Sequence, residues 1–155
     1  MQTIITELEQ LVKEYTNKFS HIEDSVFSLK LSPAKWSKKE IVGHLIDSGH
    51  NNLRRFIAGQ TEVSPHIVYD QNFWVEANNY QNMKNEEIVF LWKLINERIC
   101  AVLSNMRAEN YNKPVNTGKE NSSEKTIQWL AEDYVNHLKH HINQIFPGTF
   151  NIAYT

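Results

Sequence analysis

Cysteine is almost absent from this sequence, since Cys100 is the single one among 155 residues. The chain therefore holds no internal disulfide and no cluster of thiolates that could bind zinc. No run of apolar residues approaches the roughly eighteen of a membrane span, and the N-terminal residues lack the charged and apolar regions of a secretion signal. We therefore expect a cytoplasmic protein.

An excess of one charge is also lacking. Sixteen Lys and Arg stand against 18 Asp and Glu, which gives a formal net charge of −2. Duplex nucleic acids and anionic membranes are usually bound by a basic face, so neither is an expected partner. Hydrophobic residues make up 41% and charged residues 22%, as in ordinary globular proteins. Together with the length, this predicts one domain over residues 1–155 with a real core.

Glycine and proline are scarce, at five and four residues, and they interrupt the chain at few places. Between the interruptions, apolar residues recur at the spacing of an amphipathic helix. The pattern predicts four helices, over residues 4–19, 37–59, 85–106 and 126–146. No run of alternating apolar and polar residues is long enough to indicate a strand.

Three of the four predicted helices have a recognisable start. Ser37 and Glu40 have the spacing of a capping box, in which each side chain bonds the other's backbone amide. Asn85 and Thr126 are predicted N-caps of the third and fourth helices. The fourth helix should stop at Pro147 and Gly148.

Four amphipathic helices must bury their apolar faces against each other, which predicts an all-α four-helix bundle. The link over residues 60–84 is long enough to run the full length of the bundle. The second and third helices should therefore be parallel, giving an up-down-down-up order with a long crossover. Residues 112–123 are predicted to form a polar loop.

Seven histidines are the unusual feature of the composition. His137 and His141 lie four residues apart, on the same face as the apolar residues of the fourth helix, whereas His140 points away from it. Two inward histidines at this spacing could bind one divalent metal ion. Two hydrogen-bonded core histidines are the alternative, and the pair alone does not separate the two.

A third histidine strengthens the metal hypothesis. His44 lies about 10 Å from the start of the second helix, and the midpoint of His137 and His141 lies about 10 Å from the end of the fourth. If these helices are antiparallel, the three imidazoles meet at one end of the bundle. Three histidines with an open fourth position are typical of a catalytic metal site.

Polar residues continue along the second helix from His44. Ser48, Asn51 and Arg55 follow it at helical spacing and form one line, well away from the apolar face. This line could border a cleft that leads to the metal, with Ser48 and Arg55 as candidate catalytic residues. The alternative is an ordinary solvated face.

Other chemically capable residues have simpler interpretations beside them. Glu40 could be a general base or could hold a ligand in place, but the capping box explains it without chemistry. Asp133 could orient His137 or could be an ordinary carboxylate near a helix start. Cys100 is expected to be a buried small hydrophobe. The crossover aromatics, among them Phe73, could cap the bundle or roof a cleft.

Several blocks of the sequence, taken in order, resemble the DinB-like metal-binding bundles of the DinB/YfiT type. The first is Lys35-Trp36-Ser37-Lys-Lys-Glu40-Ile-Val-Gly-His44-Leu-Ile-Asp-Ser48, followed by Asn52 and Arg55-Phe56. The others are Tyr69 to Trp74, Leu91-Trp92 with Asn96, and Asp133 to Ile145, which includes His-x-x-His-His. The resemblance covers nearly the whole chain.

This resemblance implies an up-down-down-up bundle that holds zinc or nickel on three histidines, at the positions of His44, His137 and His141. Some relatives in the family are thiol S-transferases that use bacillithiol or mycothiol, or isomerases that depend on such a thiol. Others carry only a hydrolase label. Fold and metal site therefore transfer to this chain better than any one reaction.

The sequence thus favours a metal-dependent enzyme, either a thiol S-transferase of the bacillithiol-transferase type or a metal-assisted hydrolase. Its expected partners are a small-molecule electrophile and a low-molecular-weight thiol, and a homodimer is left open. The ion would lower the pKa of a bound water or thiol so that it can attack the electrophile. The alternative is a non-catalytic metal-binding module, or a stress-response interaction module.

Overall fold

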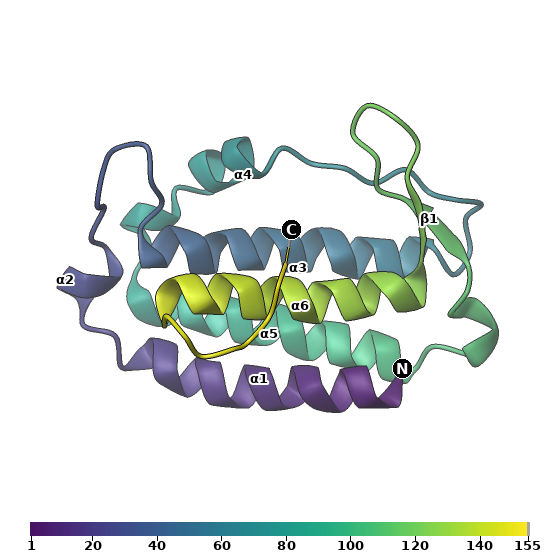
Figure 1. Cartoon of the computed structure of the whole chain (residues 1–155), viewed down its shortest axis with the longest axis horizontal. Helices are drawn as coiled ribbons and strands as arrows, with labels where there is room; N and C mark the ends of the chain where they lie inside the picture. The colour runs from purple at the N-terminus through teal and green to yellow at the C-terminus, as the bar shows by residue number, and fades with distance from the viewer. Residues whose placement is uncertain (155) are drawn as a thin grey trace.

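The computed structural model describes residues 1–154, and four long helices make up most of it (Figure 1). They are α1 Gln2–Ser20, α3 Lys38–Ala58, α5 Asn85–Ser104 and α6 Ile127–Ile145. Each helix packs against two others: α3 contacts α5 and α6, and α1 contacts the same two helices on the other side. Within residues 1–154, no helix combines the length and hydropathy that a membrane crossing requires.

The chain direction of the four helices follows the predicted order. Figure 1 shows α3 and α5 running the same way, with α1 and α6 running opposite to them. The up-down-down-up bundle and its long crossover are therefore confirmed. Fully buried side chains from all four helices fill the centre, among them Leu8, Leu45, Trp92 and Leu138.

The helix starts follow the predicted caps with one exception. The Ser37 side chain accepts from the Glu40 amide and the Glu40 carboxylate accepts from the Ser37 amide, so the capping box is present. The Thr126 hydroxyl accepts from the Trp129 amide at the start of α6. The predicted cap at Asn85 was wrong by one residue, because Lys84 takes the N-cap position and offers no side-chain bond.

The connections contain more structure than the sequence pattern indicated. Short helices occur at α2 Asp24–Phe27 and α4 Gln71–Asn78, with 3-10 turns η1 Tyr80–Asn82 and η2 Ala108–Asn110. The predicted polar loop carries a hairpin of β1 Pro114–Asn116 and β2 Glu124–Thr126, which are antiparallel. Strands of three residues are too short to show an alternating pattern.

The crossover runs along one side of α3, as Figure 1 shows for α4 and the chain before it. Ile67 donates its amide to the Asn116 carbonyl, so the crossover is also tied to the hairpin. Farther along, Asn78 and Tyr80 both donate to Asp47 in the middle of α3. These contacts place the crossover over the polar line of α3 rather than leaving that line to solvent.

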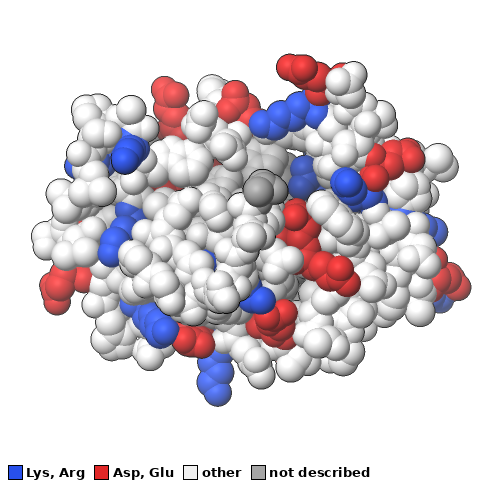
Figure 2. Space-filling model, viewed as in Figure 1, with Lys and Arg blue, Asp and Glu red and all other residues white. Residues whose placement is uncertain are grey.

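The last residues fold back along the bundle. The Asn143 side chain donates to the Phe150 carbonyl at 2.9 Å and accepts from the Phe150 amide at 2.8 Å. Figure 1 shows the segment after α6 returning across that helix toward α3. On the face in Figure 2, acidic and basic side chains are interspersed, and no field of one sign extends over the bundle.

Candidate metal centre

Three imidazoles meet between α3 and α6. His44 lies near the start of α3, and His137 and His141 lie on successive turns near the end of α6. Because the two helices are antiparallel, these positions come level with each other. One ring nitrogen from each histidine lies within 4.8 Å of the other two. The predicted convergence of the three side chains is therefore present in the structure.

The remaining ring nitrogens differ in their surroundings. His137 Nδ1 lies 3.4 Å from the Ser48 hydroxyl, and His141 Nδ1 lies 3.0 Å from the Gln144 amide oxygen. These contacts orient both rings, and His137 Nε2 faces His44 Nε2 in the shared centre. The Trp36 ring packs on His44 at 5.0 Å between centroids and covers that side.

Hydrogen bonding within residues 1–154 does not account for His44. Its Nε2 faces His137 Nε2 at 3.2 Å, and only one of these two nitrogens can donate to the other. Its Nδ1 is buried and has no hydrogen-bond partner in the described chain. Buried polar atoms of this kind normally have a partner, so the alternative interpretation, two hydrogen-bonded core histidines, does not satisfy this ring.

The rings are held in their neutral form. Burial, with a smaller contribution from His141, lowers the pKa of His44 to about 3. Burial also lowers the pKa of His141 to about 4, although the Gln144 contact opposes this. The pKa of His137 lies well below its usual range because of burial and the neighbouring imidazoles. Near neutral pH all three rings therefore offer unprotonated nitrogens.

These properties fit a divalent ion. Neutral imidazole is a ligand for zinc, nickel and copper, and three imidazoles leave one tetrahedral position open. A ring whose second nitrogen is held by a hydroxyl or an amide oxygen is oriented as metal-binding histidines usually are. His140 lies outside this group: its ring is 4.9 Å from that of His141, and its Nε2 faces the Gln144 side chain.

Only some residues of the polar line of α3, which runs from His44 through Ser48 and Asn51 to Arg55, lie beside the three imidazoles. Ser48 is buried and contacts His137, as a residue beside the metal should. Asn51 is also buried, but its side chain donates to the Asp47 carbonyl of its own helix. Arg55 is half-buried, and its charge is close enough to lower the pKa of His137. A solvated face, the alternative interpretation, was wrong because the crossover covers it.

The acidic candidates lie away from the imidazoles. Both oxygens of Glu40 are engaged, one by the Ser37 amide and one by the Lys30 ammonium group at 2.8 Å. Asp133 was a candidate to orient His137, with an ordinary carboxylate near a helix start as the alternative, and the contact to that ring comes from Ser48. Asp133 lies instead near Arg55 and Tyr154, and burial raises the pKa of its carboxyl group.

Sequence reasoning missed several neighbours of the centre. Tyr154 places its ring 5.8 Å from that of His137, and Tyr69 lies close to Ser48 and Arg55. Trp36 packs on the His44 ring. The order of the family motifs was the one signal available for Trp36 and Tyr69. No local pattern indicated Tyr154, because a fold-back of the chain brings it to the site.

Asp47 is a further residue that the sequence did not single out. It is fully buried, and one of its oxygens accepts from Tyr80 at 2.7 Å and Asn78 at 3.0 Å. Its second oxygen has no partner within the described residues. Burial raises the pKa of this carboxyl group to about 6, against the opposing effect of Tyr80. It joins the crossover to α3 one turn beyond His44.

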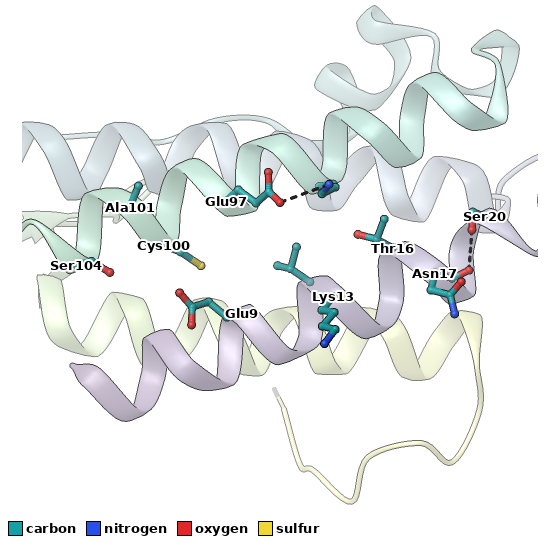
Figure 3. A pocket seen from close by; sticks show the side chains of 11 residues that line it. Glu9, Lys13, Thr16, Asn17, Ser20, Glu97, Cys100, Ala101 and Ser104 are labelled. Carbon is teal, nitrogen blue, oxygen red and sulfur yellow. Dashed lines mark hydrogen bonds and ion pairs between the residues drawn. The ribbon is translucent and has the colours of Figure 1, made fainter.

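A groove of about 790 Å³ lies elsewhere, between α1 and α5 (Figure 3). Its lining includes Glu9, Lys13, Glu97 and Cys100, and Figure 3 shows their side chains spread along the two helices rather than meeting at one point. Burial raises the pKa of the Cys100 thiol to about 12, so it is protonated and a poor nucleophile at neutral pH. The expectation of a buried, inert cysteine is confirmed.

Known proteins are similar to this sequence over most of its length. A protein of Bacillus cereus strain AH820 named "putative metal-dependent hydrolase" is 25% identical over 146 residues, which are 94% of this chain and 83% of the relative. A protein of Bacillus anthracis strain A0248 with the same name matches to the same extent. The chain therefore spans most of the length of these relatives.

Solved structures share the fold. YfiT from Bacillus subtilis, described as "a probable metal-dependent hydrolase with an unusual four-helix bundle topology", superposes with a TM-score of 0.82 at 24% identity. The match covers 94% of this chain and 83% of YfiT. A mycothiol-dependent maleylpyruvate isomerase gives a TM-score of 0.72 at 11% identity, over 91% of this chain and 59% of that one.

The family assignment comes from the sequence as a whole. The sequence model of the DinB superfamily matches residues 6–145, a span that holds all four long helices except the first four residues of α1. All three histidines of the cluster fall inside this span. The chain belongs to the DinB superfamily.

Proposed function

We propose that this protein is a metal-dependent hydrolase that holds its ion on His44, His137 and His141. The observation that carries the proposal is the cluster itself, in which three neutral imidazoles from two helices bring ring nitrogens within 4.8 Å of each other. The names of the relatives from Bacillus support the same activity class. Zinc or nickel is the proposed metal, because both bind imidazole well.

The chain's own residues would prepare the site for this chemistry. A divalent ion bound there supplies a Lewis acid that lowers the pKa of a water or thiol at its open position. Ser48 and Gln144 hold the rings of His137 and His141 in their ligating orientation. Trp36 covers one side of the His44 ring, so we expect the substrate to approach from another side, where Tyr154 and Arg55 lie near His137.

A second candidate is the transfer of a low-molecular-weight thiol, such as bacillithiol, to a small electrophile. Within residues 1–154, the three rings form hydrogen bonds with each other and with two further residues, Ser48 and Gln144. Neither of these two side chains is a carboxylate. Hydrolysis commonly uses a general base to take a proton from water. A thiol that is bound to a metal ion ionises without a general base, which favours this second candidate.

The test is a comparison of metal-loaded and chelated protein in two assays. One follows hydrolysis of p-nitrophenyl esters, and the other follows conjugation of bacillithiol or mycothiol to 1-chloro-2,4-dinitrobenzene. Metal-dependent hydrolysis supports the first proposal, and metal-dependent conjugation supports the second. If the loaded protein retains its ion but shows neither activity above that of the chelated protein, the non-catalytic metal-binding module is favoured instead.

A further inference from the structure

Arg55 is held firmly beside the candidate metal centre. Its Nε and Nη2 both donate to the Ile67 carbonyl, at 3.2 and 2.8 Å, and its Nη1 donates to the Asn52 amide oxygen at 3.4 Å. The guanidinium group is thus fixed between α3 and the crossover. A cation with a fixed orientation can recognise a ligand with little loss of side-chain entropy.

The charge of Arg55 is not neutralised within residues 1–154. None of the ion pairs within 4.0 Å in this part of the chain includes Arg55. Asp133 is near enough to raise the pKa of Arg55 slightly against burial, but it lies beyond ion-pair distance. A half-buried cation without a paired anion is costly, and binding sites for anions commonly contain one.

Two donors of Arg55 have no partner within residues 1–154. A guanidinium group has five N–H donors, and the three bonds above use one on each nitrogen. One N–H therefore remains on Nη1 and one on Nη2. A carboxylate accepts two such parallel bonds, and this is the usual geometry of arginine with a carboxylate.

A chain of contacts links the guanidinium group to the three histidines: Arg55 donates to the Asn52 amide oxygen, the Asn52 amide nitrogen donates to the Ser48 hydroxyl at 3.4 Å, and that hydroxyl lies 3.4 Å from His137 Nδ1. The Tyr69 hydroxyl lies close to the Ser48 hydroxyl and to the charge of Arg55. Arg55 also shares the face of α3 that carries His44 and Ser48. A molecule with its reacting group at the metal would therefore extend toward Arg55 along a wall of hydroxyl groups.

We propose that the substrate carries a carboxylate, which Arg55 binds while the reacting group lies at the three-histidine centre. This inference rests on the proposed function, because it needs a metal ion at that centre. One guanidinium group with two free donors matches a monoanion, and the nearby Asp133 disfavours the second charge of a phosphate. The substrate class is thus a small carboxylic acid with its reactive group at some distance from the acid.

The test uses protein loaded with cobalt(II), because binding of a thiol to cobalt produces an absorption band. The probes are mercaptoacetate, 3-mercaptopropionate and 4-mercaptobutyrate, each paired with the mercapto-alcohol of the same length. We expect at least one acid to bind about tenfold or more tightly than its alcohol. Arg55→Met should reduce the affinity of that acid to the affinity of the alcohol, and leave the alcohol unchanged.

Two further variants complete the experiment. Arg54→Met is the matched control, since Arg54 is the exposed neighbour, and it should keep the preference for the acid. Arg55→Lys keeps the charge without the paired donors and should keep only part of the preference. If Arg55→Met does not fold, Arg55→Lys and the comparison of each acid with its alcohol in the wild type still decide the question.

Specific results would overturn the proposal. They are equal binding of every acid and its alcohol, a preference that survives Arg55→Met, or tighter binding of 3-mercaptopropylphosphonate than of any carboxylate. Failure of the protein to bind cobalt would instead overturn the proposed function and this inference with it. If cobalt binds but no thiol produces the band, the thiol-transfer candidate and this inference fail, whereas the proposed hydrolase does not. The two failures are thus distinguishable.

Discussion

His44 and His137 are 93 residues apart in the chain, yet their Nε2 atoms lie 3.2 Å from each other. The spacing of His137 and His141 was visible in the sequence because both lie on one helix. The position of His44 followed only from an assumed antiparallel packing, which the bundle confirms. At the scale of single residues, the proposed metal site therefore depends on which imidazoles belong to the cluster.

Replacement of His141 by alanine should lower metal affinity by at least about 100-fold, because the loss of a residue that only orients a ligand already costs 10–100-fold. His140→Ala is the control and should change affinity by less than about twofold, since this ring lies outside the cluster. Competition with a chromophoric chelator would measure both. Equal losses from the two variants would contradict the assignment of the helix faces.

Asp47 predicts a dependence of stability on pH. Its pKa is about 6 in the folded protein, against the ordinary value of 3.8, so the folded state binds the proton more tightly than the unfolded chain does. This group therefore makes the free energy of unfolding fall as pH rises from about 4 through about 6. Asp47→Asn removes the effect.

The melting temperature of metal-free Asp47→Asn, compared with metal-free wild type, should therefore shift in favour of the variant as pH rises from 4 to 7.5. A relative shift of about 2–4 °C corresponds to about 1 kcal/mol in a domain of this size. Thermal melts at several pH values, followed by circular dichroism, would measure it. A difference between the two proteins that stays constant over this range would show that Asp47 does not titrate as described.

At the scale of elements, the sequence predicted what local physics determines. The capping box at Ser37 and the cap at Thr126 located the starts of α3 and α6, since caps are local hydrogen bonds. The hairpin and α4 were missed, because short elements are held by contacts with distant parts of the chain. Val115, for example, is the one fully buried residue of its strand.

The same limit applies to the site. Spacing and depth along the helices were enough to predict the three histidines. Trp36 and Tyr154 reach the centre through a loop and a fold-back, and no periodic pattern describes either path. The role of Glu40 was correctly left to the capping box, because that bond is local.

The contact between α3 and η1 gives a prediction at this scale. A Cβ atom on Gly43 would overlap the ring of Tyr80, which is buried, so the helix and the turn can pack this closely only with glycine. Gly43→Ala should therefore destabilise the protein by about 1–3 kcal/mol in urea unfolding. In a Tyr80→Ala background the same substitution should cost much less. An equal cost in both backgrounds would rule out this contact as the cause.

At the scale of the whole molecule, the metal is expected to add stability without being needed for folding. All four long helices contribute to one apolar core, which includes Leu8, Leu45, Ile99 and Leu138, all fully buried. An ion that binds only the folded state at a hundredfold excess over its Kd stabilises it by about 2.7 kcal/mol. This corresponds to a rise in Tm of roughly 5–11 °C.

Circular dichroism melts with and without a chelator would test this expectation. The chelated protein should keep its helical signal at room temperature and melt several degrees lower than the loaded protein. Loss of the helical signal on chelation would make the metal structural and favour the non-catalytic module. An unchanged melting temperature would mean that no tight site exists.

His44, His137 and His141 are proposed to form one metal site. Its most direct test is the metal content of untagged protein, measured by elemental analysis after loading with zinc or nickel and removal of the excess. The account predicts about one ion per chain in the wild type, and none in the variant with all three histidines changed to alanine. A wild-type protein that retains no more metal than this variant would contradict the account.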